Sequence, residues 1–216
     1  MQPQDIEQRS DAWFRLRAGS FTSSRAADLM ATTKNGPSTS RANLIAQLAV
    51  ERVTGQPTES YTNAAMQRGN DLEGEAREEF QFETGIIVDV CGYIEHPSIS
   101  RARVGSSPDG LIGEDGLIEI KCPASMAKHL AALEKGAHAV EYAWQIQHQM
   151  WVTGRQWNYA VSYDPRFPDW LKLAITRVKR DEEAIAKLEE ETVKAEVEVQ
   201  RLVEFMMEKR KGVENK

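Results

Sequence analysis

The spacing of hydrophobic and polar residues changes along the chain, and each change marks a new kind of element. Apolar residues recur every three or four positions over residues 41–54 and 64–83, which predicts two helices that end at Gly55 and Gly85. Shorter β-branched or alternating runs follow, and glycine and proline break them apart. They predict strands at residues 86–94, 101–105, 111–112 and 117–121.

The second half of the chain returns to helical spacing. We expect two helices, over residues 124–135 and 141–153, followed by two strands, over residues 157–163 and 170–178. Residues 181–211 predict a long charged helix, which either packs on the body or forms an oligomer contact. Helices that flank a group of strands predict a mixed α/β (α+β) fold. Because no long linker interrupts the chain, we expect one domain over residues 1–216.

Composition narrows the classes of protein that fit this chain. No stretch approaches the ~20 apolar residues of a membrane span, and we expect no signal peptide. Cys91 and Cys122 fit small buried thiols in a reducing cytoplasm. The net charge of −6 lies mostly in the tail, since residues 181–216 carry 11 acidic and 7 basic side chains. Any affinity for nucleic acid must therefore come from a local patch.

One strand presents charged side chains opposite apolar ones. In residues 117–121 the alternation places Glu119 and Lys121 on one face and Ile118 and Ile120 on the other. A strand that buries two isoleucines therefore presents a carboxylate and an ammonium side by side. The alternative is a surface ion pair, which contributes ~0–1 kcal/mol of stability.

Asp109 lies on the preceding strand, ten residues before Glu119. A four-residue turn over residues 113–116 would point Asp109 at the wrong face, so a turn of another length or a kink at residues 108–110 must redirect it. We expect the kink. Two acids beside a lysine can hold Mg²⁺, which activates a water that the lysine orients. With the ion bound, the pKa of the lysine would fall. The alternative makes Asp109 a turn residue only.

A third acid and a polar row lie on the predicted helices. Glu73 borders the apolar stripe of the helix over residues 64–83, where it is either a third acid of the site or an exposed glutamate. The helix over residues 141–153 carries a polar row that contacts a polar ligand or faces solvent, formed by Gln145, His148 and Gln149.

The amino end offers a candidate anion site. Arg17 precedes hydroxyl side chains at residues 22–24, which come directly before a short predicted helix. Hydroxyls in this place are usually helix N-caps. The same helix start, with its free N–H groups and a nearby arginine, can also bind a phosphate.

Taken together, these segments resemble the phage lambda exonuclease and YqaJ-type viral recombinase family, a branch of the PD-(D/E)XK nuclease superfamily. The resemblance covers about residues 11–178 and rests on motifs in one order. They read W-x-x-L-R-x-G at 13–19, G-x-x-x-E at 69–73, S-P-D-G-L at 107–111, E-I-K-C-P at 119–123, Q-x-Q-x-x-M-W-V-T at 145–153 and Y-D-P-R at 163–166. The resemblance implies a restriction-endonuclease-like core, with a central mixed β-sheet flanked by helices and followed by the long C-terminal helix.

The resemblance also implies residue roles. Asp109, Glu119 and the Ile120 carbonyl would hold two Mg²⁺ ions, with Mn²⁺ as an alternative; Glu73 would complete the site, and Lys121 would orient the attacking water. The 5′-terminal phosphate would be bound by Arg17, Ser24, Ser107 and Gln145, and Met66 would wedge into the duplex end. Two family arginines lack clear counterparts in the loops 35–40 and 124–128, where the nearest cations are Lys34, Arg41 and Lys128.

The activity that this resemblance implies is a metal-dependent deoxyribonuclease. It would degrade one strand of linear double-stranded DNA 5′→3′ from 5′-phosphorylated ends, releasing mononucleotides and leaving 3′ overhangs for recombination by strand annealing. It would act as a homotrimeric ring with a single-strand annealing protein, away from membranes, in the cytoplasm of a bacterium that hosts the phage or prophage. Two alternatives stay open: a structure-specific endonuclease of the same core, and a catalytically silent DNA-binding or loader module.

Overall fold

The computed structural model describes residues 6–34, 36–58, 64–97, 99, 101–136 and 142–214. The chain forms two compact units, each assembled from separate stretches of sequence. The first unit combines Met1–Glu59, Gly92–Ser107 and Glu182–Lys216, and the second combines Ser60–Cys91 and Pro108–Asp181. The expectation of a single domain stays a prediction. None of the described helices is long and apolar enough to cross a membrane.

The first unit contains a small mixed sheet with the strand order β1-β5-β4. β1 (Phe21–Thr22) runs parallel to β5 (Val104–Ser106), and β4 (Ile94–Glu95) runs antiparallel to β5. The elements that surround β1 in the sequence are α1 (Asp11–Arg17), the 3-10 helix η1 (Ser23–Arg25), α2 (Ala26–Met30) and the antiparallel pair β2 (Thr32–Thr33) and β3 (Gly36–Pro37).

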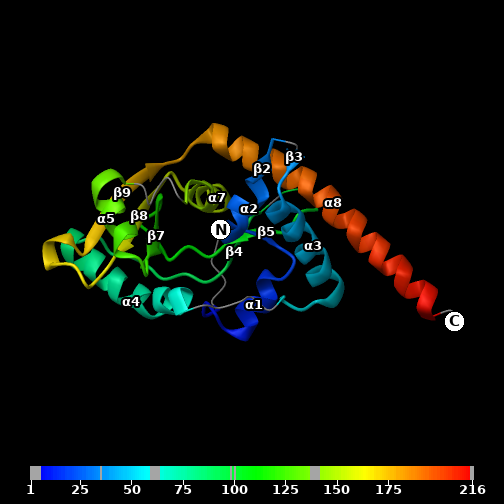
Figure 1. The fold of residues 1–216 in the computed structure, drawn as a ribbon, viewed down its shortest axis with the longest axis horizontal. Coiled ribbons are helices and arrows are strands. Elements are labelled where there is room, and N and C mark those ends of the chain that lie inside the picture. The colour runs from blue at the N-terminus through cyan, green and yellow to red at the C-terminus, as the bar shows by residue number, and fades with distance from the viewer. Residues whose placement is uncertain are drawn as a thin grey trace. The chain divides into compact units, whose positions relative to one another are not determined.

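Two longer helices of the first unit, α3 and α8, pack against each other (Figure 1). α3 (Thr39–Thr54) begins after Ser38, whose side chain accepts a hydrogen bond from the Arg41 N–H, and it ends at Gly55 with a φ of +66°. α8 (Glu182–Glu214) buries the predicted apolar stripe only in its first half, at Ile185, Leu188, Ala195 and Val199. The tail helix therefore packs inside its own unit.

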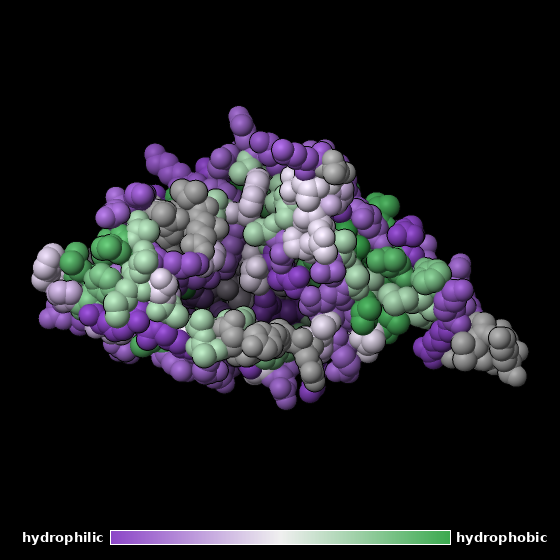
Figure 2. Space-filling model, viewed as in Figure 1, coloured by the Kyte–Doolittle hydropathy of each residue, from purple (hydrophilic) through white to green (hydrophobic). Residues whose placement is uncertain are grey.

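Both the buried and the exposed surfaces of α8 carry charged as well as apolar side chains. Arg52 of α3 forms a bidentate ion pair with Glu196 of α8, with N–O distances of 2.6 and 2.8 Å. Val197 and Phe205 are among the apolar side chains of α8 that are exposed. Figure 2 shows green, hydrophobic atoms on the surface in the part of the view where Figure 1 draws α8. Packing on the unit explains the buried apolar residues of α8.

The second unit is built on a four-stranded sheet with the order β6-β7-β8-β9. β7 and β8 are parallel, and the outer strands pair antiparallel with them. The strands are β6 (Gly110–Ile112), β7 (Gly116–Lys121), β8 (Trp157–Tyr163) and β9 (Leu173–Lys179). The sheet is thus mixed, as predicted, and β7 lies in its interior with a neighbour on each side.

Helices cover the sheet of the second unit (Figure 1). α4 (Ala64–Thr84) packs Ala76 and Phe80 onto the face that contains Ile118 and Ile120. α7 (Ala143–Thr153) packs its apolar residues onto the other face, against Leu117 and Ala160. The remaining elements of this unit are α5 (Met126–Lys135) and the 3-10 helix η2 (Asp169–Leu171). Alternation along β7 therefore points Glu119 and Lys121 toward α7.

The predicted strand over residues 86–94 is wrong. Only β4 (Ile94–Glu95) and one bridge between Asp89 and Leu111 form there. The backbone N–H groups of Ile86 and Val88 donate instead to the side chains of Thr84 and Gln81 on α4. Because the helix satisfies these donors, this segment has no need of a neighbouring strand. The predicted strand over 170–178 likewise begins as η2 before it becomes β9.

Candidate active site

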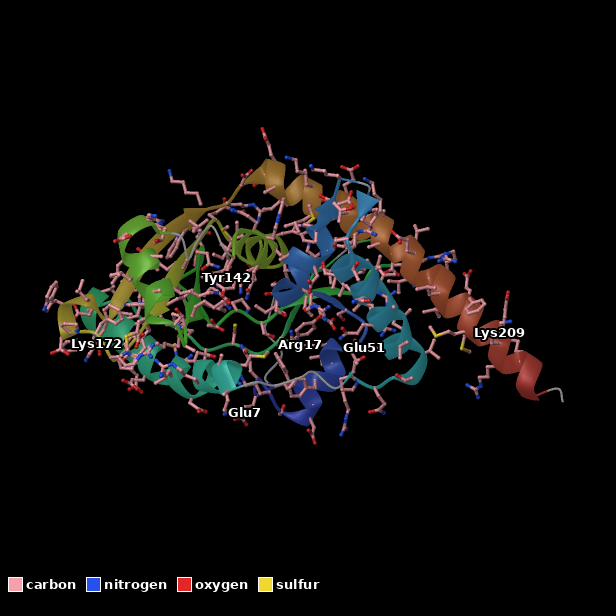
Figure 3. The ribbon with its side chains drawn as sticks, viewed as in Figure 1. Glu7, Arg17, Glu51, Tyr142, Lys172 and Lys209 are labelled. Atoms are coloured by element: carbon pink, nitrogen blue, oxygen red, sulfur yellow. The ribbon has the colours of Figure 1, made fainter. Side chains whose placement is uncertain are left out.

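The interior strand β7 carries the central acid and its cation. Glu119 is only 2% exposed, and its Oε1 atom accepts from the ammonium of Lys121. The Lys121 Nζ also lies 4.7 Å from the centre of the Tyr142 ring, a residue labelled in Figure 3. The surface ion pair that the sequence left open is therefore excluded, because the Glu119 carboxylate is buried.

Asp109 reaches the same strand from β6. Gly110, Leu111 and Ile112 pair with Ile118, Leu117 and Gly116, so the turn between β6 and β7 holds three residues, 113–115. This register, rather than the expected kink, brings Asp109 to β7, and Gly113 allows it with a φ of +51°. The Oδ2 atom of Asp109 accepts from the Ile120 N–H at 2.6 Å.

The charges around Asp109 repel its ionised form. Burial raises the pKa of the Asp109 carboxyl most, and the negative charges of Glu119 and Glu73 raise it further, so that it stands well above the ordinary aspartate value. Lys121 acts in the opposite direction. Glu119 and Glu73 therefore both lie within electrostatic reach of Asp109, which is an arrangement that a bound cation would stabilise.

Lys121 keeps its proton in this environment. Burial alone would lower its pKa, but the carboxylates of Glu119 and Asp109 outweigh burial and raise the pKa of Lys121 above its ordinary value. The predicted fall of this pKa concerns the site with its cation bound and stays a prediction; the neighbourhood formed by the protein alone is anionic and raises the pKa of Lys121. Lys121 is therefore a hydrogen-bond donor at neutral pH, as the orientation of a water requires.

Two glutamines of α7 complete the surroundings of Glu119. Gln145 donates to its Oε1 atom and Gln149 to its Oε2 atom. The two glutamines of the polar row therefore face the buried acid, and Gln149 is fully buried, as is His148, which packs against the Trp151 ring. Gln149 stood out in the sequence only as part of that row. Asn158, which donates to Gln149 at 2.7 Å, gave no signal, because a lone asparagine in a strand is uninformative.

The donor set fits a divalent cation of the magnesium type. Across the described ranges, no three histidine, cysteine, aspartate or glutamate side chains form a ready-made metal cage, so Glu73 is not placed as a third ligand beside Asp109 and Glu119. It contacts Arg77 at 3.5 Å, and Arg77 donates to the Asp109 carbonyl at 3.4 Å. Mg²⁺ is usually held by one or two carboxylates, with waters and substrate phosphate as its other ligands. Asp109 and Glu119 provide that pair.

Both cysteines of the second unit are buried and unlinked, as the sequence predicted. Burial first, and then the charge of Asp109, raise the pKa of Cys91 to about 12 and that of Cys122 to about 12. The thiols therefore stay protonated at neutral pH.

The first unit gathers three of the predicted phosphate-binding residues around Trp13. The Arg17 guanidinium stacks 3.8 Å from the Trp13 ring centre, and its Nη2 atom donates to the Ser24 hydroxyl at 3.3 Å. The Trp13 Nε1 atom donates to the Ser107 hydroxyl at 2.9 Å. Trp13, which the sequence offered only as part of a motif, thus links the other residues.

Burial lowers the pKa of Arg17 to about 10, against the opposing effects of Tyr93 and Glu51. Figure 3 labels Arg17 and Glu51, which lie close together in the first unit. A guanidinium with this pKa is still charged at neutral pH. Gln145, the fourth predicted phosphate ligand, belongs to the second unit and donates to Glu119 there.

Comparison with known proteins supplies the family. A model of the YqaJ-like viral recombinase domain matches residues 12–156, which is more than half of the chain. The protein belongs to this family. Membership supports a nuclease that acts on DNA, in agreement with the buried acid pair and lysine. Comparison with curated proteins gives no match.

Solved structures agree with the YqaJ-like assignment. An alkaline exonuclease, LHK-Exo, from Laribacter hongkongensis is 43% identical to this chain and superposes on it with a TM-score of 0.84. The match spans 94% of this chain and 100% of LHK-Exo. The same values hold for LHK-Exo in complex with dAMP. A phage-related exonuclease from Haemophilus somnus 129PT shares the fold at 15% identity, with a TM-score of 0.71, and covers 87% of this chain over 96% of its own.

In this YqaJ-like chain, Arg166 lies at the loop 124–128, for which the sequence indicated no clear arginine. The Nη2 atom of Arg166 donates to the carbonyls of Pro123 and Ala124, at 3.4 and 3.0 Å. A guanidinium therefore lies at the loop after E-I-K-C-P, held by the fully buried carboxylate of Asp164. Arg41, one candidate for the other loop, is instead buried in ion pairs with α8. Met66 is exposed near the start of α4.

Proposed function

We propose that this YqaJ-like protein is a metal-dependent exonuclease that degrades one strand of linear double-stranded DNA 5′→3′ from 5′-phosphorylated ends and leaves 3′ overhangs. The observation that carries the proposal is the cluster of the buried Glu119 and the half-buried Lys121 on β7 with the half-buried Asp109, the residue before β6. Two carboxylates that repel each other beside a charged lysine suit the hydrolysis of a phosphodiester better than they suit a binding module.

Asp109, Glu119 and the Ile120 carbonyl would hold the divalent ions, with Glu73 as an acid whose charge acts on Asp109. When bound, Mg²⁺ or Mn²⁺ would lower the pKa of a water and offset charge on the phosphoryl oxygens. Lys121, which keeps its proton, would donate from Nζ to that water and fix its direction of attack. The two glutamines of α7 would keep the Glu119 carboxylate in place.

The polarity of digestion would come from the first unit. Arg17 offers a charged guanidinium, and Ser24 and Ser107 offer hydroxyls, a donor set that suits a terminal phosphate. Gln145, which belongs to the second unit, is the fourth residue that the family resemblance assigns to this phosphate. Each cleavage makes a new 5′-phosphate, which the same donors can bind, and Met66 would wedge into the duplex end. The relative in complex with dAMP supports a mononucleotide product.

We also propose a homotrimeric ring with two metal ions in each site, acting with a single-strand annealing protein in phage or prophage recombination in the bacterial cytoplasm. The homology that supports an exonuclease extends over nearly the whole chain. Sedimentation of the protein alone, and then with the annealing partner, tests the assembly.

Digestion of defined substrates tests the activity. The protein is incubated with Mg²⁺ and three duplexes of equal sequence: linear with 5′-phosphate ends, linear with 5′-hydroxyl ends, and covalently closed circles. We expect rapid loss of one strand from the phosphorylated duplex, slower loss from the hydroxyl duplex and none from the circle. Cleavage of the circle would favour an endonuclease, and no cleavage of any substrate would favour a binding module.

A further inference from the structure

A chain of buried carboxamides leads from β8 to the central acid. Asn158 Nδ2 donates to Gln149 Oε1 at 2.7 Å, and Gln149 Nε2 donates to Glu119 Oε2. Asn158 and Gln149 are fully buried, and Glu119 is 2% exposed. Leu117 pairs with Asn158 and Glu119 pairs with Ala160, so the asparagine and the acid lie on the same face of neighbouring strands.

The anionic end dictates the direction of this chain. An ionised carboxylate only accepts hydrogen bonds, so Gln149 must turn its Nε2 atom toward Glu119. Its Oε1 atom then faces Asn158, which must present its own N–H group. The Oδ1 atom of Asn158 is buried with no hydrogen-bond partner in the described part of the chain, which shows that the asparagine is used here as a donor.

Counting lone pairs shows what the chain does to Glu119. A carboxylate has about four acceptor positions. Lys121 and Gln145 occupy two on Oε1, and Gln149 occupies one on Oε2. The position that is left lies on Oε2, and its direction is fixed by the hydrogen bond from Gln149. An apolar side chain could fill the same volume, but it would not set the rotation of the carboxylate.

We propose that Gln149 and Asn158 are positioning residues that aim the free lone pair of Glu119 Oε2 at a divalent cation. This proposal rests on the proposed function, because it assigns Glu119 as a metal ligand. Residues that orient a metal ligand through hydrogen bonds commonly change metal affinity by about 10–100-fold when they are replaced. Asn158 touches neither the ion nor the DNA in this scheme, and acts through Gln149 alone.

The test measures Mn²⁺ binding to the whole protein without DNA, by the electron paramagnetic resonance signal of the free ion. The variants are Gln149→Met and Asn158→Leu, which remove the donors at nearly constant volume, and Asn158→Asp, which keeps the shape but cannot donate when ionised. We expect Mn²⁺ affinity to fall about 10-fold or more in Gln149→Met. Asn158→Leu should also lower Mn²⁺ affinity, and Asn158→Asp should bind Mn²⁺ at least as weakly as Asn158→Leu.

Gln147→Met is the matched control. Gln147 lies on the same helix and is also buried, but its amide donates to the Lys179 carbonyl and accepts from the Asp181 N–H, both at 2.9 Å. The same substitution there removes two hydrogen bonds and leaves Glu119 untouched. We expect it to lower the thermal midpoint at least as much as Gln149→Met, while Mn²⁺ affinity stays within about twofold of the wild type, below the range for a ligand-orienting residue.

The outcomes separate this proposal from the proposed function. Mn²⁺ affinity that falls equally in Gln147→Met and Gln149→Met, or in neither, overturns the positioning role while the wild type still binds metal and cuts DNA. A wild type that binds no Mn²⁺ overturns both proposals. A wild type that binds Mn²⁺ but cuts no DNA overturns the nuclease, and the three variants still decide whether Gln149 and Asn158 orient Glu119.

Discussion

The buried ion pair between α3 and α8 offers a quantitative prediction about the first unit. Arg52 and Glu196 contact each other at two positions, and their side chains are 6% and 8% exposed. Glu196→Ala leaves the guanidinium buried without its partner. Loss of one member of a buried pair costs about 3–5 kcal/mol. At about 2–4 °C per kcal/mol for a chain of this size, we expect the thermal midpoint to fall by about 6–20 °C.

The double variant Arg52→Met/Glu196→Met distinguishes this reasoning from a simple loss of contacts. It removes both charges, so no buried charge is left unpaired, and we expect it to be more stable than Glu196→Ala alone. Helical circular dichroism during heating measures all the midpoints. Lys194→Ala, which breaks exposed ion pairs on the same helix, serves as the control and should change little. A double variant that is no more stable than Glu196→Ala would refute the reasoning.

Three further predictions concern activity. Lys121→Ala should abolish cleavage while DNA binding, measured by gel shift, survives; normal cleavage would remove the lysine from the role that we give it. Arg17→Ala should narrow the ratio of digestion rates between 5′-phosphate and 5′-hydroxyl ends, and an unchanged ratio would exclude Arg17 from phosphate binding. The raised pKa of Asp109 means that protons compete with metal at a higher pH than at an ordinary aspartate. At limiting Mg²⁺, the cleavage rate should therefore decline on acidification at a pH above the usual aspartate range. Added Mg²⁺ should move this decline to lower pH. A decline that does not depend on Mg²⁺ would contradict the assignment of Asp109 as a metal ligand.

Local patterns predicted the parts of the site that depend on local geometry. Alternation along β7 is a property of any strand, and it correctly placed Glu119 and Lys121 on one face, opposite Ile118 and Ile120. The convergence of Asp109 was also predicted, but for the wrong reason. Turn length sets the register of a hairpin, and the glycines at 113 and 116 did not show whether the turn held three residues or four.

The surroundings of the acid depend on tertiary packing, which periodicity does not give. Helical spacing placed Gln145 and Gln149 on one face of α7, but it did not show which face of the helix would meet β7. Arg166 lies more than 40 positions after Cys122, and it reaches that loop because β8 runs parallel to β7 and pairs Ser162 with Lys121, so that the two strands end side by side. The segment after α4 failed as a strand because side chains of that helix, and not another strand, satisfy its backbone.

The two protonated thiols have a practical consequence. Maleimides and similar reagents attack thiolates, and a buried thiol with a pKa near 12 is almost entirely protonated at pH 7. A single cysteine introduced on the exposed side of α8 should therefore take up a fluorophore selectively, with both native cysteines left in place. Single-molecule recordings of this enzyme on tethered DNA could then be made with an otherwise unaltered sequence.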